Sequence, residues 1–166
     1  MAEVGLCSWF ALLIVKPDWI DFAPRLASDN CELTSNATED YNCLAFAAGV
    51  TNQWWEPYVI PPSRPGIYWP AGVFPDNGVE HWVAALATVG FRPCTDASLD
   101  EAYVKVAVYG CDGDATHAAR QLKDGRWASK LGLLEDIIHA TAQDVAGGDY
   151  GEVAVVLARP RTEDDP

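Results

Sequence analysis

The chain has 166 residues and a formal net charge of −13, from 24 Asp and Glu against 11 Lys and Arg. This acidity argues against binding to nucleic acid or to an anionic membrane, because such proteins supply cations to phosphate groups. Apolar residues make up 49% of the sequence, which is enough for a real core. We therefore expect a single domain over residues 1–160, followed by an acidic tail at 161–166.

The beginning of the chain and its cysteines indicate a cytoplasmic protein. The apolar run at 5–15 has no basic residues before it and no convincing cleavage site after it, so we interpret it as a buried element. It is shorter than the roughly 18 apolar residues that span a bilayer. The five cysteines form no CxxC pair and no ligand-like spacing with His. We expect no disulfide framework, metal site or cofactor.

The first half of the chain shows helix and loop signals. Asn42 is a good N-cap for the apolar run 43–48, which Gly49 can close. The segment 53–74 is rich in Trp and Pro and is predicted to be an ordered loop, since proline prevents regular helix. Asn77, with Glu80 three residues later, is predicted to cap an amphipathic helix that stops at Gly90.

Strand patterns dominate the second half. Residues 103–109, 116–122, 126–131 and 151–158 have the alternation or β-branched content of strands, and 135–145 is predicted to be helical. Helices followed by a mostly antiparallel sheet define an α+β fold.

The turn at 123–125 allows two hairpin registers. A three-residue loop with Gly125 in the left-handed conformation pairs residue 122 with residue 126, whereas a two-residue turn shifts the pairing by one. We prefer the three-residue loop because it gathers the cations on one face, which a half-buried sheet would turn to solvent: Arg120, Arg126 and Lys130. In that register Ser129 is a diagonal neighbour of His117.

These elements define a candidate Cys–His site. At a helix start, a thiol such as that of Cys43 has its pKa lowered, and the imidazole of His117 on an adjacent strand would form an ion pair with it. Ser129 would orient the imidazole, and the backbone N–H of Cys43 would donate to an oxyanion. Each residue also has an ordinary structural interpretation: a buried thiol, a hydrogen-bonded histidine and a strand hydroxyl. His139 is expected to be an exposed or capping residue of the last helix.

The motifs resemble known families. The segment 117–129 (HAARQLKDGRWAS), with Cys43 in YNCLAFA upstream, resembles the His hairpin and nucleophile segment of papain-like NlpC-type cysteine hydrolases. This resemblance implies a papain-like core with N-terminal helices packed on the sheet, and catalysis by Cys43, His117 and Ser129. Those hydrolases usually carry His, Asn, Gln or an acid at the position of Ser129. Over residues 41 to 160 the chain resembles more closely a family of small uncharacterised bacterial proteins, which implies no activity.

Two functions from different classes follow. The first is a cytoplasmic peptidase, amidase or deamidase that acts on a neutral or cationic substrate, because the charge of the protein repels anions. The alternative is a non-catalytic module that binds a protein or peptide through the aromatic loop 54–74, since Trp and Tyr are favoured at interface centres. The oligomeric state stays open.

Overall fold

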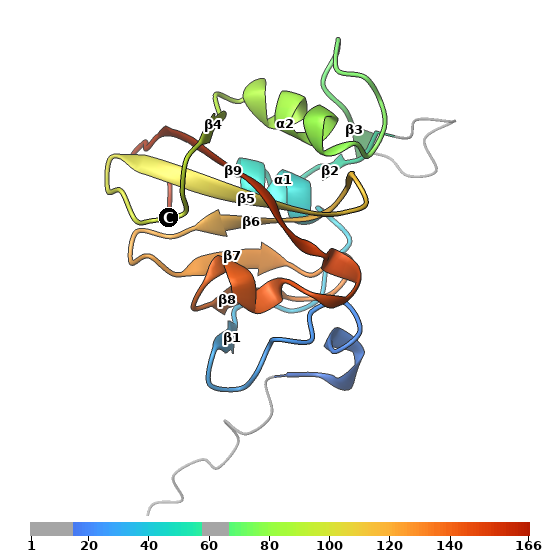
Figure 1. Cartoon of the computed structure of the whole chain (residues 1–166), viewed down its shortest axis with the longest axis vertical. Coiled ribbons are helices and arrows are strands. Elements are labelled where there is room, and N and C mark those ends of the chain that lie inside the picture. The colour runs from blue at the N-terminus through green and yellow to red at the C-terminus, as the bar shows by residue number, and fades with distance from the viewer. Residues whose placement is uncertain (1–14, 58–66) are drawn as a thin grey trace, which may run out of the picture.

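An antiparallel sheet organises the protein. The computed structural model describes residues 15–57 and 67–166. Seven strands form the sheet in the order β1-β8-β7-β6-β5-β9-β4, and every neighbouring pair is antiparallel (Figure 1). The strands are β1 (Cys31–Leu33), β4 (Arg92–Cys94), β5 (Tyr103–Cys111), β6 (Asp114–Gln121), β7 (Trp127–Lys130), β8 (Asp136–His139) and β9 (Glu152–Pro160).

Each face of this sheet carries its own hydrophobic core. On one face, α1 (Cys43–Ala48) and α2 (Val79–Ala87) pack over the inner strands, with a short parallel pair beside them, β2 (Trp54–Trp55) and β3 (Ile67–Tyr68). The opposite face is covered by three 3₁₀ turns, which are η1 (Pro17–Trp19), η2 (Ala142–Val145) and η3 (Gly148–Tyr150). Figure 1 shows α1 behind the sheet and the 142–150 segment in front of it. A side chain on β6 or β7 therefore enters one of two separate cores.

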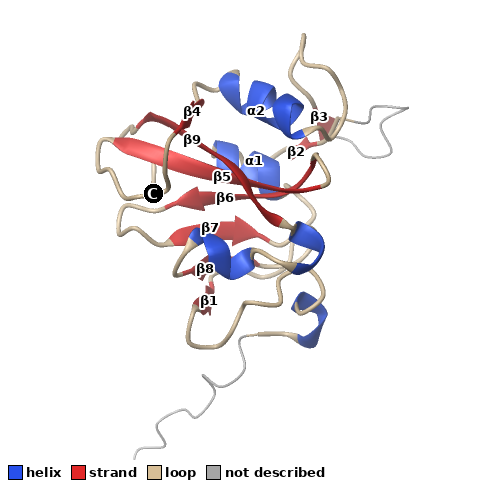
Figure 2. Ribbon diagram, in the orientation of Figure 1, coloured by secondary structure: helices blue, strands red, loops and turns tan. Residues whose placement is uncertain are grey.

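The expected α+β class with a papain-like core is wrong. The described part of the chain is mostly β, and its α-helix is confined to α1 and α2 (Figure 2). Between residues 15 and 42 there are η1 and β1 rather than packed N-terminal helices. The predicted helix at 135–145 is instead β8 followed by η2. A short apolar run is compatible with a helix or a strand. Residues 136–139 form a strand because they pair with both β7 and β1. The predicted buried element at 5–15 lies almost entirely outside the described residues.

The predicted hairpin register is confirmed. The N–H of Leu122 donates to the carbonyl of Arg126 at 2.8 Å, Gly125 has φ of 90°, and Ala119 lies opposite Ser129. The reason given for this register is wrong for two of its three cations. Arg120 and Lys130 are buried because α1 covers their face of the sheet, and only Arg126 is exposed.

The local signals around α1 work as expected. The side chain of Asn42 accepts from the N–H of Ala45 at 3.2 Å, and Gly49 ends the helix with φ of 87°. The same Asn42 side chain also bonds both backbone groups of Trp55, which ties the helix start to β2. The predicted cap of the next helix is wrong: Gly78, and not Asn77, is the N-cap of α2, and the Asn77 side chain accepts from the indole N–H of Trp82. This helix ends at Ala87 and therefore stops before Gly90.

Candidate active site

Cys43 is the first residue of α1 and lies in the core beneath that helix. Its side chain is 8% exposed. Burial raises the pKa of the thiol to about 11, against the opposing effect of the backbone N–H groups of Ala118, Leu44 and Cys43 itself and of the ammonium group of Lys130. The low thiol pKa expected from a helix start is therefore absent in this conformation, because desolvation outweighs the favourable dipoles.

His117 projects from β6 into the other core. Its ring stacks on Tyr150 with centroids 4.1 Å apart and is tilted against Tyr109 at 5.3 Å. The hydroxyl of Thr116 donates to the backbone carbonyl of Tyr150 and so holds that ring in place. The imidazole is fully buried, and burial lowers its pKa to about 3, with a further lowering by His139. His117 is therefore neutral near pH 7.

Ser129 bridges two buried histidines. Its Oγ lies 2.9 Å from Nε2 of His117 and 2.9 Å from Nε2 of His139. The Nδ1 of His139 lies 2.7 Å from the backbone carbonyl of Thr141. The expected contact between His117 and Ser129 is thus present. His139 is a member of the network that sequence reasoning missed, because its position was assigned to an exposed helix.

The chemistry of this chain of hydrogen bonds determines its direction. A carbonyl can only accept, so Nδ1 of His139 carries the proton and its Nε2 is a lone pair. The hydroxyl of Ser129 donates to that lone pair, and Ser129 Oγ accepts from the Nε2–H of His117. The remaining nitrogen of His117, Nδ1, therefore presents a lone pair. This buried Nδ1 has no hydrogen-bond partner among the described residues.

Cys43 and His117 are close to the same stretch of β6 but belong to different cores. The backbone N–H of Ala118, next to His117, faces the sulfur of Cys43. The thiol also contributes to the raised pKa of Tyr150, the residue whose ring stacks on His117. The structure therefore brings Ser129 to His117 by a direct hydrogen bond, and it places Cys43 nearby without a hydrogen bond from its thiol to Nδ1.

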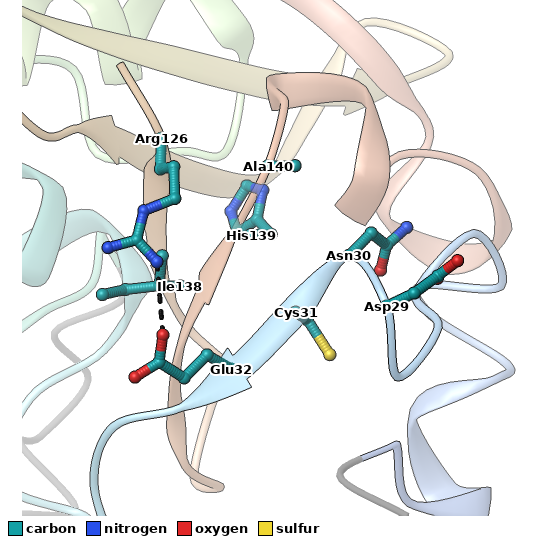
Figure 3. Close-up of a pocket in the computed structure, with 8 residues that line it drawn as sticks. All are labelled: Asp29, Asn30, Cys31, Glu32, Arg126, Ile138, His139 and Ala140. Atoms are coloured by element: carbon teal, nitrogen blue, oxygen red, sulfur yellow. Dashed lines mark hydrogen bonds and ion pairs between the residues drawn. The ribbon is translucent and has the colours of Figure 1, made fainter. Parts of the chain in front are cut away.

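A second buried thiol, that of Cys31, offers a comparison. It is also 8% exposed, and it lies opposite His139 in the pairing of β1 with β8. Figure 3 shows both residues among those that line a pocket, together with Arg126 and Glu32. The volume of this pocket is about 190 Å³, and Arg126 donates to Glu32 at 3.2 Å. Both nitrogens of His139 are already engaged. His139 therefore has no lone pair for Cys31, whereas His117 has one.

The aromatic loop is only partly described, because residues 58–66 lie outside the described part. Trp55 is buried and its ring packs on Tyr68 with centroids 5.0 Å apart, and Trp69 donates to the carbonyl of Val73. Phe74, at the end of the loop, is 63% exposed. Most of the described rings therefore belong to the core, and Phe74 presents a surface.

Two further observations concern metals and membranes. Within residues 15–57 and 67–166, no group of three His, Cys, Asp or Glu side chains is arranged to hold a metal ion. No helix in the same ranges has the length and apolar character needed to cross a bilayer.

The sequence places this protein in a family. Residues 32–158 match the model of a domain of unknown function, DUF7689, and the chain belongs to that family. The match spans the sheet from β1 to β9 and includes Cys43, His117, Ser129 and His139. Searches of curated proteins and of solved structures found no match.

Proposed function

We propose that the protein is a cysteine-dependent hydrolase that acts on an amide or thioester, with Cys43 as nucleophile and His117 as general base. The observation that carries the proposal is the direction of the buried hydrogen bonds, which leaves the lone pair of His117 Nδ1 free next to the strand that Cys43 contacts. Ser129 and His139 are positioning residues in this proposal. The resemblance of the sequence motifs to NlpC-type enzymes supports the Cys–His chemistry of this proposal, and no papain-like fold is part of it.

The protonation states of Cys43 and His117 define how the thiol would attack the substrate. The thiol and the imidazole are both neutral at rest, because burial raises the pKa of Cys43 to about 11 and lowers that of His117 to about 3. In the structure the sulfur and Nδ1 make no hydrogen bond and lie on different faces of β6, so the start of α1 must first bring them together. The thiol proton would then pass to Nδ1 as the sulfur attacks the carbonyl carbon, and the imidazolium would protonate the leaving group. Water, with His117 again as base, would hydrolyse the acyl-enzyme.

The network behind His117 suits this exchange. When Nδ1 takes the proton, Nε2–H still donates to Ser129, whose hydroxyl donates to His139. The carboxylate of Asp144 and the carbonyl of Thr141 both raise the pKa of His139 and oppose the effect of its burial. Positive charge on His117 is therefore met by an ordered chain of dipoles rather than by a carboxylate, which fits a base that holds a proton only briefly.

The setting of this reaction is part of the same proposal. A protein of net charge −13 favours a neutral or cationic peptide or protein substrate. The described cysteines, among them Cys31 and Cys43, are free thiols, which supports a reducing cytoplasm. We retain a bacterial source, as the sequence motifs imply.

The reactivity of Cys43 relative to Cys31 tests the proposal. Both residues are 8% exposed and Cys31 also lines a pocket, so Cys31 is a control with at least as much access as Cys43. In a chain with its other cysteines changed to Ser, iodoacetamide should alkylate Cys43 at least tenfold faster than Cys31, as measured by peptide mass spectrometry. His117→Gln should remove most of that difference. Equal rates for the two thiols, or rates unaffected by His117→Gln, would refute the nucleophile assignment.

A non-catalytic peptide-binding module is the second candidate function, favoured by the exposed ring of Phe74 at the end of the aromatic loop. It expects that Phe74→Ser weakens binding to an arrayed peptide library while Cys43→Ala leaves binding unchanged. The hydrolase proposal expects Cys43→Ala to abolish turnover of a peptide that is bound.

A further inference from the structure

Three arginines gather on the face of the sheet that α1 covers, at the end of the chain. Arg120 comes from β6, Arg159 from β9, and Arg161 follows directly after β9. They are close enough that Arg159 and Arg161 both lower the pKa of Arg120. Arg120 and Arg159 both donate to the carboxylate of Asp165, whereas Arg161 donates to the backbone oxygens of Pro166 and Tyr103. Two guanidinium groups therefore share one carboxylate.

The carboxylate of Asp165 is held as a ligand would be. Arg159 donates to both of its oxygens at 2.7 Å, Arg120 donates to one of them, and the backbone and hydroxyl of Thr162 donate to the other at 2.8 and 3.0 Å. Asp165 is 4% exposed, so the acidic tail at 161–166 is anchored through this residue. Bidentate guanidinium contacts of this kind are typical of carboxylate recognition.

The cluster is not fully satisfied by this occupant. Arg120 is 7% exposed, and its Nε has no hydrogen-bond partner among the described residues; the buried Nε of Arg161 likewise has none there. The guanidinium of Arg120 also lies tightly against α1, because a Cβ added at Gly49 would approach its NH1 atom to 2.9 Å. Buried guanidinium N–H groups without partners cost free energy, and a ligand with more acceptors would recover it.

An apolar hollow adjoins Arg120. It has a volume of about 310 Å³, and Arg120 and Pro166 lie in its wall. Its apolar lining comes from α1, the 123–125 hairpin and the neighbouring strands: Phe46, Leu122, Ala128 and Ile138. Pockets of this size, apolar with a few placed polar groups, are typical of ligand sites.

We propose that Arg120, Arg159 and the adjoining hollow form a binding site for an acidic peptide segment, and that residues 162–166 occupy it as an internal ligand. An aspartate of the partner would replace Asp165 on the two guanidinium groups, and an apolar side chain following it would enter the hollow. A tail with a purely structural role accounts for the ion pairs. It does not account for the unpartnered Nε atoms and the unfilled apolar space.

The attachment of the internal ligand predicts competition. A segment joined to β9 by a few residues acts at a local concentration on the order of millimolar, so an added peptide competes poorly with it in the unchanged protein. Asp165→Asn removes the carboxylate from the attached segment and leaves the arginines in place. The site then becomes available to a peptide in trans.

The experiment uses the full chain and amidated peptides of residues 162–166, so that only side-chain carboxylates are tested. Fluorescence anisotropy should give a Kd at least tenfold lower for Asp165→Asn than for the unchanged protein. A peptide carrying Pro166→Leu should bind about tenfold more tightly than the original sequence, because leucine fills the hollow. A peptide with Asp165→Asn is the matched control and should not bind.

A second measurement does not depend on the stability of that variant. In the unchanged protein, several millimolar of the Pro166→Leu peptide should increase hydrogen exchange at the amides of Thr162 and Asp165, which bond within the docked tail. Unchanged exchange together with no peptide binding would overturn the proposal and leave the tail as a structural element. Equal binding of the Asp and Asn peptides would also overturn it.

Discussion

The two buried histidines make the stability of this protein sensitive to mild acid. Burial lowers the pKa of His117 to about 3 and that of His139 to about 4, from 6.5 for both. In the unfolded chain both rings take up protons near pH 6.5, whereas the folded protein keeps them neutral. The stability that they contribute is therefore complete above the unfolded pKa and is lost as the pH falls towards the folded values.

The size of this effect follows from the proton count. Near pH 5 the unfolded chain binds roughly two protons more than the folded one at these sites, which gives a slope of about 2.7 kcal/mol per pH unit. Between pH 7 and pH 5 the free energy of unfolding should fall by about 4 kcal/mol, with each histidine contributing about half. That loss is a large fraction of the roughly 5–15 kcal/mol by which domains are stable.

Urea unfolding followed by tryptophan fluorescence at pH values from 5 to 7 measures the slope. His139→Gln removes one titrating ring and retains an amide oxygen that can accept from Ser129, so the slope of this variant should be about half. The carboxylate of Asp165, whose pKa is lowered far below its usual range, loses its contribution only at more acidic pH. In the unchanged protein, a slope that corresponds to the uptake of less than one proton, about 1.4 kcal/mol per pH unit, would refute the assignment of both histidines as neutral.

Three further substitutions test the packing and ion pairs. Ser129→Ala leaves two buried histidine nitrogens without a partner and should cost about 2–4 kcal/mol in urea unfolding; a loss below about 1 kcal/mol would contradict the network. Gly49→Ala and Gly72→Ala both place a side chain at positive φ, but only the methyl group at position 49 meets a buried guanidinium group. The melting temperature of Gly49→Ala should therefore fall further than that of Gly72→Ala. Equal shifts would show that this contact is loose. Asp165→Asn should cost about 3–5 kcal/mol because it strands a buried arginine, whereas the exposed Asp124→Asn should stay within about 1 kcal/mol; similar losses would contradict the buried pair.

Local sequence signals predicted the parts of this structure that depend on neighbouring residues. Residues 123–125 predicted a short hairpin loop with Gly125 at positive φ, and they left two strand registers open. Asn42 and Gly49 likewise marked both ends of α1. These features are decided by backbone conformation and capping over a few residues, which is why they could be predicted from the residues alone.

The features that the sequence did not predict depend on which element covers each face of the sheet. In the sequence, Lys130 is an ordinary cation of a strand. It is buried because α1 packs over it, and its ammonium group donates to the carbonyl of Leu134 and pairs with the carboxylate of Asp136. His139 entered the site because residues 136–139 pair as a strand with β7 instead of forming a helix. No local pattern encodes either outcome, since both arise from contacts between segments that are distant in the sequence or ambiguous in their period.

The sequence by itself determined the limits of α1, the acidic charge and a short hairpin loop at 123–125 with two possible registers, because these follow from local conformation and composition. The register that forms, and with it the hydrogen bond between His117 and Ser129, belongs to the tertiary structure. Only the tertiary structure decided that the domain is mostly β, that Cys43 and His117 enter different cores on either side of β6, and that Asp165 closes on Arg120 and Arg159. The physical reason is that burial sets the pKa values and pairings of these groups, and burial is a property of the assembled layers rather than of any single segment.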